Sequence, residues 1–535
     1  MMQKRFGRAA AWALCLALPV VLTGCSKQAA VTAEAESAYT EAHRPQFHFT
    51  PPAMWMNDPN GLVYFEGEYH LFYQFYPDDT VWGPMHWGHA VSRDLVRWEH
   101  LPVALYPDEH GYIFSGSVVV DHDNTSGFGK DGEPPLVAIF TYHDPERGKA
   151  GTNDHETQGI AYSHDRGRTW TKYEGNPVLP NAAKHKDFRD PNVFWHEATQ
   201  RWIMALSVFD HVQFWASPDL RDWTYLSSFG EGSGAHGGTW ECPDLFPVQV
   251  EGSDEARWVL ILNLNPGGPQ GGSGTQYFVG DFDGRTFTLD NRFAATLDSE
   301  EAVWLDWGRD NYAGITWYGV PPSDGRRIFI GWMSNWDYAQ QVPTSTWRSA
   351  MTVPRSLHLV DTDAGYRLHS APVQELASLR GDSVDLPERE FEGTFEATGV
   401  TASQAEIELV FDLASTDARE IGVVLTTSSG EEYRLGFDVE QARFRSDRRK
   451  AGPGDFSDNF AARVHEAPRF AHTDTLRLQL LLDVASVEMF ADDGATVMTE
   501  IYFPSTPFET LSLYALDGKA RLVSGTAYRL ERIWE

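Results

Sequence analysis

Residues 57–76 read NDPNGLVYFEGEYHLFYQFY and carry the clearest local signal for structure in the chain. Two apolar and aromatic runs, residues 61–65 and 69–76, flank the short glycine-containing segment 66–68. Runs of this kind on either side of a tight turn predict a β-hairpin. Asp58 and the proline after it stand just before the first predicted strand, so a carboxylate that could take part in catalysis lies at the start of that strand.

The same local context occurs three times. In each copy an acidic residue is followed, at once or after one residue, by proline, then by Asn or Asp, and then by an apolar strand. The copies are residues 58–63 (DPNGLV), 190–194 (DPNVF) and 241–246 (ECPDLF).

The remainder of the chain favours an all-β fold. Short apolar and aromatic runs are broken by Gly, Pro, Asp and Asn, with few helical periods of useful length. Candidate innermost strands begin near Gly61, Ile113, Asn192, Asp244 and Asn311, and the intervals leave room for about four short strands each. The sequence therefore predicts a five-bladed β-propeller, with a β-sandwich with long loops as the alternative.

A change of composition suggests a second domain. After Arg355 the aromatic residues become fewer, and alternating strands return near the C-terminus. We predict a propeller over residues 45–358, a linker over 359–388 with one short helix at 373–379, and a C-terminal β-sandwich over 389–535. Whether the sandwich packs on the propeller, binds polymer or mediates dimerisation stays open, as does the oligomeric state.

The repeated carboxylates predict a site. In a propeller, equivalent starts of the inner strands open onto one end of the central channel, so Asp58, Asp190 and Glu241 are expected to converge. Neighbouring carboxylates raise one another's proton affinity, and one can stay protonated while others ionise. Glycoside hydrolysis needs this division of labour between an acid and a nucleophile.

Two other interpretations stand beside this one. An acidic residue before proline is a common turn device, and Asp144, which also precedes a proline, is followed by no strand and is expected to form a turn. Clustered carboxylates also bind metals, but no His pair at ligand spacing accompanies them. His86 and His89 are expected to pack, and we predict neither a metal nor another cofactor.

The motifs around these carboxylates resemble those of a known family. Residues 55–61 (WMNDPNG), 188–191 (FRDP) and 240–243 (WECP) look like the three signature motifs of glycoside hydrolase family 32, the β-fructosidases. Supporting similarities lie at residues 82–89, 114–117, 306–313 and, in the sandwich, 486–490. The resemblance implies a five-bladed propeller followed by a β-sandwich, which agrees with the prediction above.

The resemblance also implies roles for single residues. Asp58 matches the nucleophile that attacks the anomeric carbon of a terminal fructosyl unit, and Glu241 matches the general acid/base of a retaining mechanism. Asp190 matches a residue that stabilises the transition state through fructose hydroxyls, with Arg189 beside it.

Further residues match positions that hold the fructose ring. They are Asn57, Gln74, Trp82, Ser115 and Trp336. An aromatic wall offers a sugar an apolar surface, while amide and hydroxyl groups fix its orientation. The alternative is that both tryptophans belong to the propeller core and that Gln74 is a hydrogen-bonded strand amide.

The N-terminus predicts export. Basic residues precede an uncharged run from Ala9 to Leu22, as in a secretory signal peptide, here assigned to residues 1–24. Cys25 follows in a context that resembles a bacterial lipobox, so we predict a lipid on Cys25 and a flexible tether over residues 25–44. The protein is then anchored to the cell envelope, periplasmic or at the cell surface; the alternative is an ordinary cleaved signal.

The net charge limits the classes of partner, and the cysteine content limits the disulfides, that the protein can have. Lys plus Arg number 43 against 76 Asp plus Glu, a formal charge of -33, which repels phosphate backbones and argues against nucleic acid. The chain has 3 cysteines. Cys15 would be removed with the signal peptide and Cys25 would carry the lipid, so Cys242 would be left without a partner and no intramolecular disulfide is expected. Cys242 either helps to hold Glu241 protonated or simply packs.

The predicted function is a retaining, exo-acting β-fructosidase that hydrolyses levan, inulin or both, and sucrose. Residues 267–276 resemble levanases and inulinases more than dedicated invertases. The alternatives are a sucrose hydrolase or fructosyltransferase of the same family, a non-catalytic glycan-binding lipoprotein, and a sialidase. A sialidase would call for an arginine cluster that the sequence does not contain.

Overall fold

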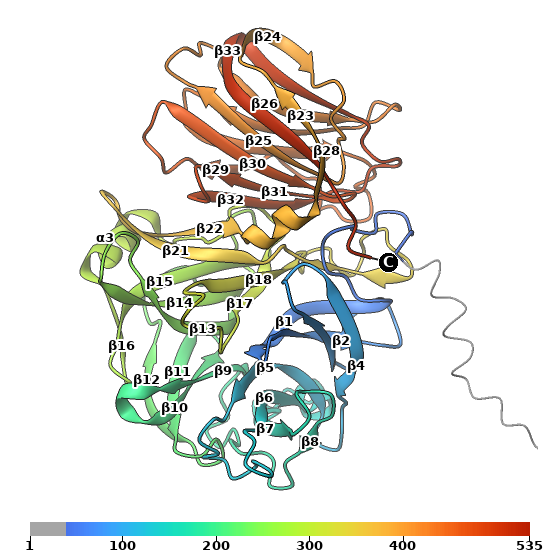
Figure 1. Cartoon of the computed structure of the whole chain (residues 1–535). Coiled ribbons are helices and arrows are strands. Elements are labelled where there is room, and N and C mark those ends of the chain that lie inside the picture. Colours follow the sequence, from blue (N-terminus) through green and yellow to red (C-terminus); the bar gives the residue numbers. More distant parts are fainter. Residues whose placement is uncertain (1–38, 535) are drawn as a thin grey trace, which may run out of the picture. The chain divides into compact units, whose positions relative to one another are not determined.

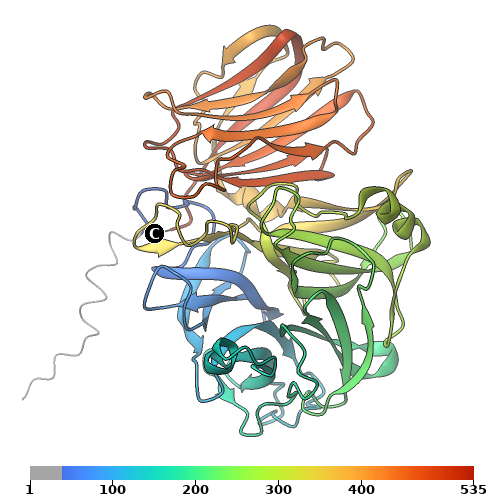
Figure 2. The same ribbon diagram turned by 180° about the vertical axis from the view of Figure 1, so that it is seen from behind.

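The predicted hairpin opens a five-bladed propeller. In the computed structural model, which describes residues 39–534, strands β1 (Met54–Phe65) and β2 (Glu68–Tyr76) pair antiparallel as expected. Five sheets follow one another around a central channel, and a sandwich of strands lies against the propeller (Figures 1 and 2). The predicted fold class is therefore confirmed.

Each blade is an antiparallel sheet whose first strand lies innermost. The second blade contains β5 (Tyr112–Val120), β6 (Leu136–His143), β7 (Glu156–Ser163) and β8 (Thr171–Lys172). The third contains β9 (Phe188–His196), β10 (Arg201–Val208), β11 (His211–Ser217) and β12 (Thr224–Phe229). The fourth contains β13 (Thr239–Gln249), β14 (Ala256–Asn265), β15 (Gly274–Phe282) and β16 (Phe287–Leu289).

The first and fifth blades close the ring. The first adds β3 (His86–Ser92) and β4 (Trp98–Leu105) to the hairpin, and the fifth contains β17 (Tyr312–Thr316), β18 (Arg327–Met333), β21 (Arg355–Thr362) and β22 (Gly365–Pro372). Beyond β18 the chain forms β19 (Trp347–Arg348), which pairs parallel to β1, and β20 (Ala350–Met351), which pairs with β18. These short strands join the last blade to the first.

Apolar side chains fill the spaces between blades. One buried cluster joins Val63, Phe72 and Trp87 of the first blade to Val118 and Phe140 of the second. Burying each such side chain contributes roughly 1.5–3 kcal/mol. Because both faces of a blade are covered by its neighbours, nearly all residues of strands such as β5 and β10 are buried.

The few helices are short and lie between strands. They are α2 (Pro145–Lys149), α3 (Asn291–Glu300) and the 3-10 segments η2 (Glu197–Thr199) and η3 (Gln374–Leu379). Asp144 caps α2, its side chain accepting from the backbone N–H groups of Glu146 and Arg147, so its role is the local one that was expected. No helix among the described residues is long and apolar enough to cross a membrane.

The predicted linker is wrong. Residues 359–388 include the second half of β21 and all of β22, which complete the fifth blade, then η3, and then β23 (Arg380–Leu386) of the sandwich. The propeller therefore extends to Pro372 rather than to residue 358. Polar and charged residues stand among the apolar ones in β21 and β22, and β23 is mostly exposed, so the apolar pattern expected of strands is weak in this segment.

The C-terminal domain is the predicted sandwich. Its strands are β23, β24 (Arg389–Glu396), β25 (Ala405–Asp412), β26 (Glu420–Thr426), β27 (Glu432–Asp438), β28 (Arg443–Lys450), β29 (His465–Pro468), β30 (Thr475–Leu482), β31 (Ser486–Ala491), β32 (Thr496–Ile501) and β33 (Thr510–Leu530). The first half of β33 pairs with β24 and β26, and its second half with β23 and β25, so this strand belongs to both layers.

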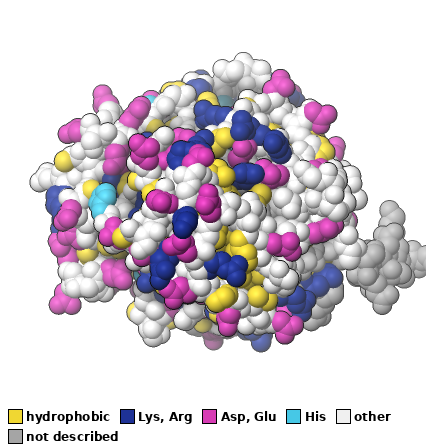
Figure 3. All heavy atoms as spheres, turned by 90° about the horizontal axis from the view of Figure 1, so that it is seen from above, with side chains coloured by type: hydrophobic (Ala, Val, Ile, Leu, Met, Phe, Trp, Pro, Cys, Tyr) yellow, Lys and Arg dark blue, Asp and Glu magenta, His cyan; other side chains and the backbone are white. Residues whose placement is uncertain are grey.

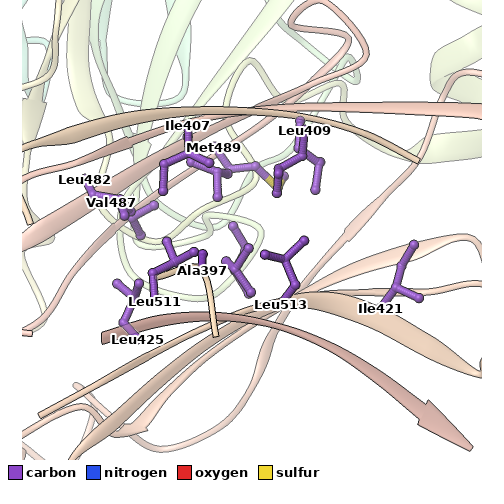
Figure 4. Packing of buried hydrophobic residues seen from close by; sticks show 14 of the residues in the cluster. Ala397, Ile407, Leu409, Ile421, Leu425, Leu482, Val487, Met489, Leu511 and Leu513 are labelled. Atoms are coloured by element: carbon purple, nitrogen blue, oxygen red, sulfur yellow. The ribbon is translucent and has the colours of Figure 1, made fainter. Parts of the chain in front are cut away.

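Figure 4 shows the core between the two layers. Ile407 and Met489 project from one layer toward Leu511, Leu513 and Leu425 of the other. All five side chains are buried. Residues of opposite layers interdigitate in this way in β-sandwiches generally.

Buried charges connect the propeller to the sandwich. Arg355 on β21 donates to Glu488 on β31 and, at 2.9 Å, to Asp306. His48, before the first blade, lies 2.7 Å from Asp483 and 2.8 Å from Glu488. Burial alone lowers the pKa of His48, but the two carboxylates overcome it and raise the pKa to about 9.

The predicted tether ends too late. Arg44 is fully buried, and its guanidinium donates to Thr50 Oγ1 at 3.0 Å and to the Pro51 carbonyl at 2.8 Å and lies over the Trp347 ring. Residue 44 thus belongs to the folded domain. The predicted signal peptide and the lipid site at Cys25 lie outside the described residues.

Candidate active site

The three carboxylates of the repeated motif line one cavity. Asp58 comes from β1, Asp190 from β9 and Glu241 from β13, each near the start of an inner strand. The cavity has a volume of about 340 Å³. The convergence predicted from the propeller geometry is therefore observed.

An irregularity in each inner strand shapes this end of the channel. The pairing register shifts between Met56 and Pro59 on β1, between Arg189 and Asn192 on β9 and between Glu241 and Asp244 on β13, with similar shifts on β5 and β17. Bulges of this kind bend a strand and redirect its side chains. A residue in a bulge does not need to donate to the ladder of backbone hydrogen bonds, so proline, which has no N–H, is tolerated there. This explains why proline recurs beside the acidic residue.

Asp58 is partly buried and held by two donors. Asn57 Nδ2 donates to its Oδ1 at 2.9 Å, and Ser115 Oγ donates to its Oδ2 at 3.0 Å. Trp55 Nε1 in turn donates to Asn57 Oδ1 at 2.7 Å and fixes the amide. Burial and then the charge of Glu241 raise the pKa of Asp58 to about 6, against the lowering effect of these hydrogen bonds. At neutral pH the group is ionised, as a nucleophile must be.

Asp190 occupies a strained backbone position beside Cys242. Its φ is 63°, and that of Cys242 is 44°. The Cys242 backbone N–H donates to Asp190 Oδ2 at 3.0 Å, and the Cys242 Sγ lies 3.7 Å from carboxylate oxygens of both Asp190 and Asp58. Burial raises the pKa of Asp190 despite the opposing charge of Arg189, and Glu241 and Asp58 raise it further. The thiol thus contacts these two aspartates, whereas the sequence interpretation placed it beside Glu241.

Glu241 is held by a cation and a phenol. Arg189 donates to its Oε1 through Nε at 3.2 Å and through Nη2 at 2.9 Å, and the Tyr312 hydroxyl donates to its Oε2. Arg189 also donates to Asp187 at 2.7 Å and to Glu156 at 3.2 Å. Burial opposes the charge on Arg189, but the surrounding carboxylates raise its pKa well above the usual value. The arginine therefore stays charged and fixes the glutamate.

The predicted sugar-binding residues form the cavity walls. Asn57, Gln74, Trp82, Ser115, Arg189 and Trp336 all line it. Trp82 is 37% exposed and packs edge-on against Phe114, so it is a wall rather than core. Gln74 Nε2 is buried and, within the part of the chain that the structure describes, has no hydrogen-bond partner, as expected of a donor that faces a bound ligand.

Several residues of the cavity region were not identified from the sequence. They are Tyr312, which donates to Glu241, and the lining residues Phe114, His143, His155, Glu156, Asp187 and Gln340. Asp187 stands three positions before Asp190 and could have been included with that motif. Phe114 and Tyr312 lie in the segments 114–117 and 306–313 that were singled out in the sequence, and could also have been included. The others lie in segments with no motif around them.

His143, His155 and Glu156 form a compact group at one side of the cavity. Their donor atoms lie within 4.8 Å of one another, a separation that a metal ion could bridge. However, Arg189 already donates to Glu156 and would repel a cation there. The group instead supports Arg189, and Phe114 stacks on the His143 ring.

Comparison with known proteins agrees with this geometry. Residues 48–372 match the model of the glycosyl hydrolases family 32 N-terminal domain, and residues 375–529 match that of the family 32 C-terminal domain. A levanase of Bacillus subtilis is 46% identical over 501 residues, covering 93% of this chain and 72% of the relative. An extracellular exo-inulinase of Aspergillus niger is 40% identical, covering 93% of this chain and 96% of the relative.

Solved structures show the same architecture. The exo-inulinase of Aspergillus awamori superimposes with a TM-score of 0.84 at 36% identity, covering 93% of this chain and 100% of that chain. A fructofuranosidase of Schwanniomyces occidentalis, solved with fructose, superimposes with a TM-score of 0.83 at 33% identity, covering 92% of this chain and 99% of that chain.

Proposed function

The chain belongs to glycoside hydrolase family 32, and on that basis we propose that it is a retaining β-fructosidase that releases terminal fructose from fructans. The observation that carries the proposal is the single cavity that holds Asp58 and Glu241 among sugar-binding side chains. The levanase and exo-inulinase relatives, which align over most of this chain, support fructans as substrates.

The reaction proceeds by double displacement. The Asp58 carboxylate attacks C2 of the terminal fructosyl unit while Glu241 gives its proton to the departing glycosidic oxygen, so that one C–O bond forms as another breaks. Glu241, now ionised, takes a proton from water, whose oxygen attacks C2 and releases Asp58. The net change is the addition of one water across the glycosidic bond.

The surrounding residues stabilise the charges of this cycle. Ser115 and Asn57 orient Asp58 by donating to its two oxygens. Arg189 and Tyr312 fix the orientation of Glu241 by donating to its two oxygens. Asp190 is placed to accept from fructose hydroxyls as positive charge develops on the sugar.

The dimensions of the cavity favour action at chain ends. A volume of about 340 Å³ is near the lower limit for small-ligand pockets and suits one or two sugar units. Trp82 and Trp336, on loops after β2 and β18, stand at its walls. A site of this size accepts the end of a chain rather than an internal segment.

The proposal is tested with protein that begins at Ser26, incubated separately with levan, inulin and sucrose, with products followed over time by chromatography. Fructose alone from a polymer is the expected result, and the faster polymer names the preferred linkage. Longer products from sucrose would indicate a fructosyltransferase. Binding of the polymers without any product would indicate a glycan-binding protein instead.

The proposal includes export and lipid anchoring at Cys25. It is supported by the basic residues, the uncharged run from Ala9 to Leu22 and the lipobox-like context of the cysteine. Expression of the full chain with a radiolabelled fatty acid should label the protein and place it in the membrane fraction. A Cys25→Ser variant should be unlabelled; equal labelling of both would refute the assignment.

A further inference from the structure

The large aromatic residues that are exposed lie on the propeller. In the part of the chain that the structure describes, the exposed large hydrophobic residues are Trp82, Tyr106, Phe209, Tyr225 and Val523. Val523 alone belongs to the sandwich, and Figure 3, which views the molecule from the sandwich side, shows Lys and Arg grouped among Asp and Glu there. Trp82 already has a role as a wall of the active-site cavity, whereas Phe209, also 37% exposed, has none.

Phe209 stands at the same end of the propeller as the catalytic carboxylates. It lies in the turn between β10 and β11, and β10 runs antiparallel to β9, which begins beside Asp190. The backbone N–H of Phe209 donates to the carbonyl of Asp187 at 3.2 Å, and its carbonyl accepts from Trp240, the residue before Glu241. Because Asp187 lines the active-site cavity, Phe209 is one hydrogen bond away from the wall of that cavity.

The backbone of Phe209 is strained. Its φ is 55°, in the left-handed region that glycine and asparagine adopt most readily and that a bulky side chain disfavours. The ring is 37% exposed, so the strain is not offset by burial in a core. Strained residues of this kind cluster at functional sites. Neither the turn nor the core requires a phenylalanine here.

A depression of about 630 Å³ begins at the residue after Phe209. It is lined by Asp210, His211, residues 228–233 and His236. The His236 ring stacks on Trp240 with 5.0 Å between centroids, and its Nε2 donates to the carbonyls of Gly230 at 3.1 Å and Ser233 at 3.2 Å. One wall of the depression is thus anchored to the residue that precedes Glu241.

An acceptor and a donor beside the Phe209 ring are available to a ligand. Among the described residues none donates a hydrogen bond to the Asp210 carboxylate, and the nearest cationic side chain, His211, lies 3.6 Å away. Lys186 Nζ lies 4.2 Å from the centre of the Phe209 ring and 3.6 Å from Asp187 Oδ2. Its side chain is 58% exposed, and such contacts between an exposed cation and a ring are weak.

The substrate of the neighbouring cavity identifies the ligand. That cavity suits one or two sugar units, so the following units of a fructan must continue over the surface around it. A sugar presents an apolar face to an aromatic ring, while its hydroxyls accept from an ammonium group and donate to a carboxylate. We propose that Phe209, with Lys186 and Asp210 beside it, binds a fructosyl unit of the polymer beyond the two units in the cavity. This inference rests on the proposed function and makes Phe209 a determinant of the preference for polymer over sucrose.

The test measures kcat and KM for sucrose, for oligosaccharides of three to six sugar units prepared from inulin and from levan, and for the two polymers. In the wild type kcat/KM should rise once the chain is long enough to reach Phe209. Phe209→Ala should raise KM for the longer chains about three- to tenfold with little change in kcat. Sucrose is too short to reach the ring, so its kcat/KM should stay within about twofold. Phe209→Tyr keeps the ring and should behave like the wild type.

Two further variants control for folding and for the loss of any exposed ring. Tyr225→Ala removes a ring that is 47% exposed on the same blade, but β12 begins at the end of the blade away from the active site, so no effect of chain length is expected. Phe209→Gly suits a φ of 55°, so it should fold with a melting temperature close to that of the wild type and still lose the preference for long chains. Unchanged KM for long chains in Phe209→Gly would overturn the inference.

Tyr106→Ala tests another exposed aromatic residue, at the end of β4 in the first blade. A raised KM for long chains in this variant, with none in Phe209→Ala, would place the polymer on the first blade and overturn the inference.

Binding is measured separately, by calorimetric titration of Asp58→Asn protein with the same oligosaccharides. If the wild type hydrolysed no fructan, the proposed function would fall. An affinity that rises with chain length and drops when Phe209→Ala is added would still support the sugar-binding role of Phe209, and equal affinities would refute it. Hydrolysis of fructans with kinetics that do not depend on Phe209 would support the proposed function and refute the inference.

Discussion

Arg189 donates two hydrogen bonds to Glu241, from Nε at 3.2 Å and from Nη2 at 2.9 Å, both to the same carboxylate oxygen. The guanidinium is itself fixed by Glu156 and Asp187, so the orientation of the proposed acid/base depends on a chain of charged groups that begins on β7. Rigid placement of a catalytic carboxylate reduces the reorganisation that the reaction requires.

Arg189→Lys should therefore impair catalysis although it keeps the charge. Lysine cannot reproduce the forked contact, and we expect kcat/KM to fall by about 100-fold for sucrose and polymer alike. The measurement is steady-state kinetics on both substrates, with the melting temperature as a check of folding. Activity within a few-fold of wild type would show that catalysis does not require the paired hydrogen bonds from Arg189 to Glu241.

Asp58→Asn and Glu241→Gln should each lower hydrolysis by several orders of magnitude, because each removes a group that forms or breaks bonds to the substrate. Asp144→Asn is the matched control: it too precedes a proline but only caps α2, and it should retain wild-type activity. Substantial activity in either site variant, in samples free of contaminating hydrolase, would remove that residue from its assigned role.

The stability of Asp58→Asn should depend on pH. In the folded protein the pKa of Asp58 is raised to about 6, above its ordinary value of 3.8, so the native carboxyl loses its proton less readily than the unfolded one. The free energy of unfolding of the wild type therefore falls as pH rises from about 4 to 6. Above pH 6 the total loss from this group is about 3 kcal/mol. Denaturant unfolding should show the variant more stable than wild type at pH 7 and similar at pH 4; equal stability throughout would contradict a raised pKa.

The same pKa governs the acid limb of the pH profile. Because the nucleophile must be ionised, kcat/KM should decline as pH falls below about 6. Ser115→Ala removes a donor that favours the ionised form and should move this limb upward by about 1 pH unit. A limb that stayed in place in the variant would mean that another group controls it.

His48 should make the junction of the two domains sensitive to alkali. Its pKa is raised to about 9 in the folded protein, against 6.5 ordinarily, so its stabilising charge is fully present below pH 6.5 and is lost as pH rises through 9. The difference in unfolding free energy between wild type and His48→Gln should shrink by about 3 kcal/mol between pH 6 and pH 9.5. A constant difference would indicate that His48 acts by packing alone.

The main features of the site could be predicted because they depend on local sequence. Asp58, Asp190 and Glu241 each lie in or beside a bulge of an inner strand, and a bulge with proline leaves a recognisable pattern. Tyr312 and Glu156 carry no such pattern. Their roles arise only when β17 and β7 are brought beside the carboxylates by the closed ring.

The boundary between the two domains was harder to predict. Strands β21 and β22 carry polar residues among their apolar ones and β23 is mostly exposed, so the composition of this segment resembles that of a linker.

The most direct test of the central claim is the configuration of the first sugar released. Levan or sucrose is incubated with a high concentration of enzyme, and the C2 signal of free fructose is followed by ¹³C NMR before mutarotation is complete. Double displacement through Asp58 and Glu241 predicts β-fructofuranose as the first product, with no oligosaccharide intermediates from the polymer. Initial release of the α anomer would contradict the assignment of Asp58 as a nucleophile, and a ladder of oligosaccharides would contradict exo action.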